Sequence, residues 1–167
     1  TAFSLHNFHM GTATDPTAPG ADGESLAYDG TYATETGPGG GVMVYAPIGG
    51  ADVANCGTTA FATVGSGGSL AAVASCSGTD QVEAFQKSLG TVAPGASAWW
   101  GVAILFDGSG TAAVPETAWA SFLAGRAADA LYGDVLAEWE AYRTPPPSGL
   151  SADETATWRQ SEAVLRM

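Results

Sequence analysis

The stretch "SLAYDGTYATETGPGGGVMVYAPI", residues 25–48, decides the fold of this chain. Its first part reads as two short strands around the turn Asp29-Gly30, because an Asp-Gly pair between runs of strand-forming residues is typical of a β-turn. Its last part, residues 41–48, is continuously apolar and bounded by glycines, as in a strand buried on both faces. These segments predict an antiparallel β-sheet.

Further strands are expected on both sides of this stretch. Residues 2–10, "AFSLHNFHM", alternate imperfectly as a half-buried strand does, with Phe3, Leu5, Asn7 and His9 on one face and Ser4, His6, Phe8 and Met10 on the other. The segments "TTAFATV" and "LAAVAS" flank the turn "GSGGS" and predict a hairpin.

A last strand is predicted from Ala98 to Phe106, after a Pro94-Gly95 turn, whereas "DQVEAF" is interpreted as part of a polar bridge. The chain to about Asp107 is therefore expected to be antiparallel and sandwich-like.

The hydrophobic period changes at Pro115, which suits the first turn of a helix. Apolar residues then recur at steps of three and four, as on one face of a helix: Trp119, Phe122, Leu123, Ala127, Ala130 and Leu131. Gly133 weakens this helix, and residues 134–143 resume it until three consecutive prolines end it. Ser151 and Glu154 then form a capping-box signature ahead of another helix.

Charge is strongly one-sided, with 17 acidic residues against 5 basic ones and a formal net charge of −12. Such a chain repels phosphate backbones and anionic membranes, so nucleic-acid and lipid-surface roles are excluded, while neutral substrates such as sugars remain open. Hydrophobic residues make up 46% of the chain, which indicates a folded protein. The sequence has neither an apolar run long enough for a membrane span nor a leader pattern.

Two cysteines, Cys56 and Cys76, lie 20 residues apart. This spacing suits neither a zinc knuckle nor a redox pair. Facing each other across the predicted hairpin, they are expected to form a disulfide, which would indicate a secreted or periplasmic protein. Two reduced, buried thiols are the alternative.

Histidine and the amino terminus offer no convincing active site. His6 and His9, three residues apart on a strand, point to opposite faces and have no convergent carboxylate, so neither a metal site nor a cofactor site is expected. Thr1 could be the nucleophile of an amino-terminal amidase, although a bare Thr at the start of a chain is more often a trimmed end.

The acidic residues and tryptophans also favour structural roles. Most carboxylates lie in loops or on helix faces, as Glu138 and Glu140 do, so solvated surface is expected rather than the carboxylate pair of a glycosidase. Trp99 and Trp100 could stack on a sugar, but on a strand one ring must face inward, which favours core packing. No catalytic residue is predicted.

Several segments, taken in order, resemble bacterial glucoamylase-type enzymes of glycoside hydrolase family fifteen. They are "LHNFHMG", "ESLAYDG", "GGVMVYAPIGG", "AFQKSLGTVAPGASAWWGVAILF", "LAEWEAYR" and "LSADETATWRQSEAVLRM". In that family a large antiparallel super-sandwich precedes linker helices and an (α/α)6 barrel. The loop "GTATDPTAPGADGE" and the cysteine pair are departures, which leave the substrate open.

The resemblance implies a division of the chain into four parts. Residues 1–110 correspond to an incomplete sandwich portion, 111–143 to linker helices, 144–150 to a Pro-rich spacer and 151–167 to the first barrel helix. The expected partners are further chains or segments of the same enzyme, with the oligosaccharide bound mainly outside this chain.

The function implied is inverting hydrolysis of α-glucosides, with the catalytic glutamates on segments that follow this one. The alternatives are a phosphorylase of the same architecture, a free-standing carbohydrate-binding sandwich, and the Thr1 amidase.

Overall fold

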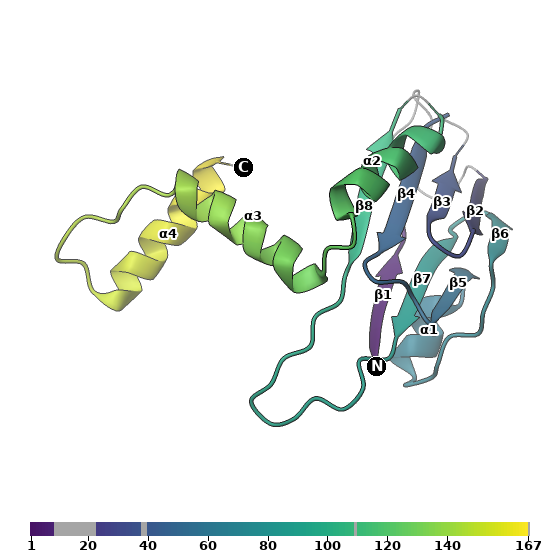
Figure 1. Cartoon of the computed structure of the whole chain (residues 1–167), viewed down its shortest axis with the longest axis horizontal. Coiled ribbons are helices and arrows are strands. Elements are labelled where there is room, and N and C mark those ends of the chain that lie inside the picture. The colour runs from purple at the N-terminus through teal and green to yellow at the C-terminus, as the bar shows by residue number, and fades with distance from the viewer. Residues whose placement is uncertain (9–22, 38–39, 109, 167) are drawn as a thin grey trace. The chain divides into compact units, whose positions relative to one another are not determined.

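The structure, a computed structural model, describes residues 1–8, 23–37, 40–108 and 110–166. It contains two compact units, Thr1–Asp129 and Ala130–Met167. The first unit holds two antiparallel sheets and two helices, and the second holds most of one helix and all of another (Figure 1).

The larger sheet has five antiparallel strands in the order β6-β2-β3-β4-β8. Their bounds are β2 (Glu24–Tyr28), β3 (Ala33–Thr36), β4 (Val42–Pro47), β6 (Ser75–Gly78) and β8 (Val102–Asp107). The predicted turn joins β2 to β3: Gly30 has a positive φ, and the Asp29 carboxylate accepts hydrogen bonds from the backbone N–H groups of Thr31 and Tyr32 at 2.7 and 2.8 Å. The predicted strands at residues 25–48 are thus confirmed.

The smaller sheet has three antiparallel strands in the order β1-β7-β5. Their bounds are β1 (Ala2–His6), β5 (Val53–Gly57) and β7 (Val82–Lys87). The central strand, β7, is buried over its first four residues because both of its faces are covered. The interpretation of "DQVEAF" as part of a polar bridge is therefore wrong, because this segment contains most of β7.

The two sheets pack face to face through a cluster of Ala33 and Tyr45 from one sheet and Ala54 and Phe85 from the other. Tyr45 and Phe85 are fully buried. Aromatic side chains of this size contribute most of the apolar area buried in a small core. This packing makes the first unit a β-sandwich, as the sequence predicts.

The outer face of the smaller sheet is covered by α1 (Ala60–Gly65) and by Leu70. Ala60 and Leu70 form a second cluster with Val82 and Ala84, against which Phe3 and Leu5 also pack. "TTAFATV" is therefore largely helical, and "LAAVAS" reaches a strand only at Ser75, so the predicted hairpin is wrong. A short apolar run has no period that separates helix from strand, and contacts with the sheet decide between them.

The remaining helices are α2 (Ala113–Leu123), α3 (Ala128–Tyr142) and α4 (Ala152–Arg166). Helix α2 lies against β8 and β4, with Pro115 buried in its first turn. The predicted capping box of α4 is present: the Glu154 carboxylate accepts from the Ser151 backbone N–H at 2.8 Å, and the Ser151 hydroxyl accepts from the Glu154 N–H at 3.3 Å. The predicted strand at Ala98 begins only at Val102.

Candidate functional site

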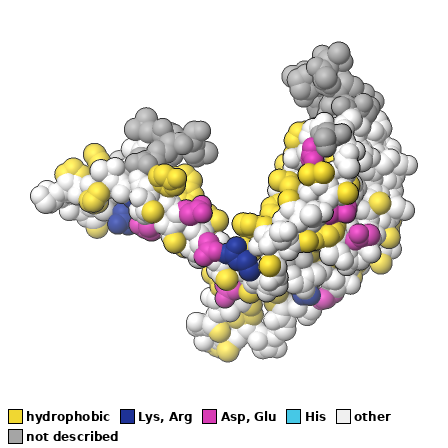
Figure 2. Space-filling view, turned by 45° about the horizontal axis from the view of Figure 1, so that its top comes forward, with side chains coloured by type: hydrophobic (Ala, Val, Ile, Leu, Met, Phe, Trp, Pro, Cys, Tyr) yellow, Lys and Arg dark blue, Asp and Glu magenta, His cyan; other side chains and the backbone are white. Residues whose placement is uncertain are grey.

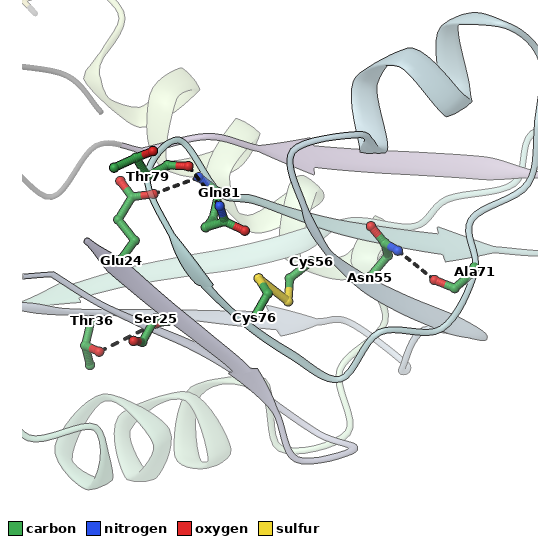
Figure 3. Close-up of a disulfide and its surroundings, with 9 residues drawn as sticks. All are labelled: Glu24, Ser25, Thr36, Asn55, Cys56, Ala71, Cys76, Thr79 and Gln81. Carbon is green, nitrogen blue, oxygen red and sulfur yellow. Dashed lines mark hydrogen bonds between the residues drawn. A yellow bond between two sulfur atoms is a disulfide. The ribbon is translucent and has the colours of Figure 1, made fainter. Parts of the chain in front are cut away.

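A disulfide joins Cys56 on β5 to Cys76 on β6, with their Cα atoms 5.9 Å apart (Figure 3). These strands are edge strands of different sheets, so the bond ties one sheet to the other rather than closing a hairpin. The predicted pairing is thus present, with a different structural role. Loop residues between the cysteines are also fixed to the smaller sheet, because the Asn55 amide donates to the Ala71 carbonyl at 2.7 Å.

Strand register places two rows of side chains opposite each other between the sheets. In the smaller sheet, Glu83 lies between His6 and Cys56 as their cross-strand partner. In the larger sheet, Leu26 lies between Cys76 and Glu35. Paired residues of an antiparallel sheet project to the same side, and the disulfide brings the ends of the two rows together. Glu83 and Glu35 therefore both face the sandwich interior.

Two of the interior carboxyl groups accept hydrogen bonds from the protein. The Tyr45 hydroxyl donates to the Glu35 carboxylate. The Gln81 backbone N–H donates to the Glu24 carboxylate at 2.9 Å (Figure 3). Glu24 and Glu35 are 2% and 1% exposed. Burial, followed by the negative charge of Glu35, raises the pKa of Tyr45, so this tyrosine remains a hydrogen-bond donor.

Glu35 accepts the Tyr45 hydroxyl at its Oε2, whereas its Oε1, like the Oε1 of Glu83, has no hydrogen-bond partner among the described residues. Glu83 is the third buried acid of the sandwich interior. Its side chain is 1% exposed. Burial, and then the negative charge of Glu35, raise the pKa of Glu83 to about 8. At neutral pH this carboxyl group therefore holds a proton. We call Glu35, Tyr45 and Glu83 the interior carboxyl cluster.

His6 lies beside this cluster, with its ring centroid 5.2 Å from that of Tyr45 and 6.3 Å from that of Phe85. Its Nε2 is 2.8 Å from the Ser4 hydroxyl, and burial lowers its pKa. His6 is thus packed between the sheets, where burial favours its neutral form. His9 lies outside the described residues.

The exposed acidic residues do not converge on a common site. Asp29 holds the β2–β3 turn, while Glu138 and Glu140 are exposed on α3, where Glu140 pairs with Arg143. Thr1 is exposed at the end of β1. In the described part of the chain, Asp29, Glu138 and Thr1 are not shown to approach another acid or base, and the base beside Glu140 is Arg143, which directly follows α3.

The two tryptophans of "AWWG" differ in burial. Trp100 packs against the sandwich core, and its Nε1 donates to the Gly50 carbonyl at 3.2 Å, whereas Trp99 is 54% exposed. Neither residue is in a strand. Of the two tryptophans, Trp100 therefore packs against the core and Trp99 does not.

The chemistry available to the interior carboxyl cluster is proton binding. A general acid or base must come within hydrogen-bonding reach of its substrate. Glu35 and Glu83 are only 1% exposed between the two sheets, so a substrate cannot reach them. Among the described residues, no group of three or more His, Cys, Asp or Glu side chains could hold a metal ion. No described helix is long and apolar enough to cross a membrane.

The interior carboxyl groups were missed because acidic residues were assigned to the surface as a class. The alternation within the strands is the signal that identifies them. Glu24 shares a face with Leu26, Glu35 shares one with Ala33, and Glu83 shares one with Phe85, and the apolar member of each pair is buried. For Glu83, that signal depends on knowing that "DQVEAF" contains a strand.

Comparison of this chain with protein-family models, with curated proteins and with solved structures finds no significant match.

Proposed function

We propose that this chain is the non-catalytic sandwich and linker-helix portion of a secreted, glucoamylase-type glycoside hydrolase that cleaves α-glucosides with inversion. The proposal rests on the sequence segments that resemble family fifteen. The observation that best supports it is a disulfide-tied antiparallel sandwich followed by helices that expose aromatic side chains. In this proposal the sandwich supports a helical catalytic domain, whose first helix is α4.

The helices of the second unit carry large apolar side chains at their surface. No residue of α3 is buried, and the exposed side chains include Tyr132, Val135, Leu136, Trp139, Tyr142 and, on α4, Trp158. Hydrophobic side chains also appear at the surface in Figure 2. Exposed apolar surface of this extent marks an interaction site in a folded protein. A helical domain that packs on α3 and α4 would cover it.

Acid–base catalysis is assigned to that helical domain because of where the carboxyl groups of this chain lie. The interior ones are closed off between the sheets, and Glu138 and Glu140 are exposed without a convergent partner in the described residues. Inverting hydrolysis needs one carboxylic acid to protonate the leaving oxygen and one carboxylate to activate water on the opposite face of the sugar. The disulfide favours the oxidising compartment of a secreted protein.

The test compares the 167-residue chain with a longer polypeptide that includes the proposed helical domain. The longer protein is expected to release β-glucose from an α-glucan, measured by NMR immediately after cleavage, and the chain alone is expected to release none. Glucose 1-phosphate formed in the presence of inorganic phosphate would instead identify a phosphorylase.

Amide variants locate the catalytic groups. Glu138→Gln and Glu140→Gln in the longer protein should keep the rate within about tenfold, or about 1.4 kcal/mol of barrier. Loss of turnover in a folded variant, or hydrolysis by the chain alone, would contradict the assignment of catalysis to another domain.

The exposed Trp99 favours one second candidate, a carbohydrate-binding sandwich. Such a module should bind an oligosaccharide without cleaving it, and binding should be lost in Trp99→Ala. Calorimetric titration of the chain with maltooligosaccharides separates this candidate from a purely structural role, for which no heat of binding is expected.

A further inference from the structure

We propose that the interior carboxyl cluster is a pH-sensitive contact between the two sheets, which packs tightly while Glu83 is protonated and loosens when Glu83 ionises. The inference concerns the sandwich itself and does not depend on the proposed enzymatic function. It rests on the positions of the interior groups, their hydrogen bonds and their burial.

The geometry places two buried acids, one from each sheet, in the same interior. Glu35 on β3 accepts the Tyr45 hydroxyl at Oε2, but the Oε1 atoms of Glu35 and of Glu83 on β7 both have no hydrogen-bond partner in the described residues. An ionised carboxylate buried without partners is far less stable than a protonated one. The protein therefore gains stability by keeping a proton on Glu83.

Among the described residues, the titratable groups that act on Glu83 supply no fixed positive charge. His6 on β1 is its cross-strand partner, and burial lowers the pKa of His6 and so favours its neutral form. Cys56 on β5, the partner on the other side, is in the disulfide. The remaining groups whose charges act on this region belong to the larger sheet and are the acids or tyrosines Glu24, Tyr28, Glu35 and Tyr45.

Basic residues are scarce in the sequence, which has five Lys and Arg in all. None precedes Lys87, which is at the end of β7 and pairs with Asp52 at 3.3 Å. Loss of the Glu83 proton therefore adds negative charge opposite Glu35, and only separation of the sheets or entry of water can relieve the repulsion. The disulfide at the end of the two rows limits how far the sheets separate.

The sign of the pH dependence follows from the raised pKa. Between about pH 4.5, where an unfolded glutamate titrates, and pH 8, the folded state holds a proton that the unfolded state has lost. Stability from this group is complete below that window and falls as the pH rises through it, with the unfolding constant increasing by up to about tenfold per pH unit. Above about pH 8, Glu83 is ionised in both the folded and the unfolded state, so the stability falls no further.

The first measurement is infrared spectroscopy of the wild-type chain. A carboxylic-acid C=O band is expected at pH 6.5, where exposed carboxyls are ionised, and it should disappear towards pH 9 while the fold persists. A spectrum without this band at pH 6.5 would overturn the proposal. This measurement needs no variant.

The second measurement is urea unfolding of the wild type, Glu83→Gln and Asp80→Asn from pH 5 to 9. Gln has the size of a protonated Glu but cannot ionise, so Glu83→Gln should lose the decrease in stability that the wild type shows between pH 5 and about pH 8. Asp80→Asn changes an exposed acid near the start of the same strand and should keep the wild-type profile. Identical profiles for Glu83→Gln and wild type would contradict the proposal.

The third measurement follows reduction of the Cys56–Cys76 bond by a phosphine at each pH. Loosening of the sheets should make the disulfide of the wild type several-fold more reactive at pH 9 than that of Glu83→Gln, with equal rates at pH 6. Equal rates at both pH values would show that ionisation of Glu83 does not open the sandwich. If Glu83→Gln does not fold, the infrared result alone decides the proposal.

Discussion

The Tyr45 hydroxyl donates a hydrogen bond to the Glu35 carboxylate inside the sandwich, where both side chains are fully buried. The two residues lie on neighbouring strands, β4 and β3. A buried carboxylate is tolerated when a donor compensates for the water it has lost, so this pair allows an acid to occupy a core position.

Tyr45→Phe should destabilise the sandwich. It removes the hydroxyl and leaves Glu35 with one hydrogen bond fewer, at a cost of about 1.5–3 kcal/mol for a bond to a charged group. Urea unfolding followed by circular dichroism measures the loss. Tyr142→Phe, at a side chain that is 67% exposed, is the matched control and should change little. Equal stability of both variants would mean that the Glu35 contact contributes nothing.

The double variant Cys56→Ala/Cys76→Ala should unfold more easily than the wild type. The disulfide closes a loop of about 20 residues, for which loop closure contributes roughly 3 kcal/mol. The wild type unfolded in the presence of a reductant should match the double variant, because both lack the cross-link. Two titratable thiols in the unfolded, unreduced wild type would show that the bond does not form.

Trp100→Ala and Trp99→Ala form a matched pair of adjacent substitutions. Trp100 packs on the core and donates to the Gly50 carbonyl, so its loss should cost about 3–5 kcal/mol. Trp99 is 54% exposed, and its truncation should cost much less. Thermal melts of the two variants measure the difference. A Trp99 variant as unstable as the Trp100 variant would contradict the assigned burial.

Ser151→Ala should weaken the first turn of α4. The substitution removes the hydroxyl that caps the helix, which typically costs about 0.5–2 kcal/mol of helix stability. Amide hydrogen exchange over residues 152–158 should accelerate, whereas the sandwich, a separate compact unit, should keep its protection. Ser161→Ala, within the same helix, is the control and should not accelerate exchange.

The same capping box should respond to acid. Hydrogen bonds from the Ser151 side chain and backbone lower the pKa of Glu154 below its usual value of 4.5. A lowered pKa contributes stability that is present above the unfolded value and is lost as the pH falls through the folded one. The protection factors of the amides at the start of α4, which are corrected for the intrinsic exchange rate at each pH, should therefore fall in acid, and Glu154→Gln should remove that response. An unchanged acid response in Glu154→Gln would assign it to another group.

Local patterns in the sequence determined much of the secondary structure. The Asp29-Gly30 turn, the apolar run of β4, the first turn of α2 at Pro115 and the Ser151–Glu154 capping box depend on neighbouring residues, so each could be predicted without the fold. The charge of −12 and the cysteine pair also followed from the sequence alone.

Tertiary structure decided the features that depend on distant contacts. β7 is central to its sheet because α1 covers one face and the larger sheet covers the other, which no period within "DQVEAF" could indicate. The cysteines tie two sheets rather than one hairpin because the segment between them folds into a helix instead of a returning strand. Glu35 and Glu83 are interior residues because strand register, set by partners far away in the sequence, turns them towards the core.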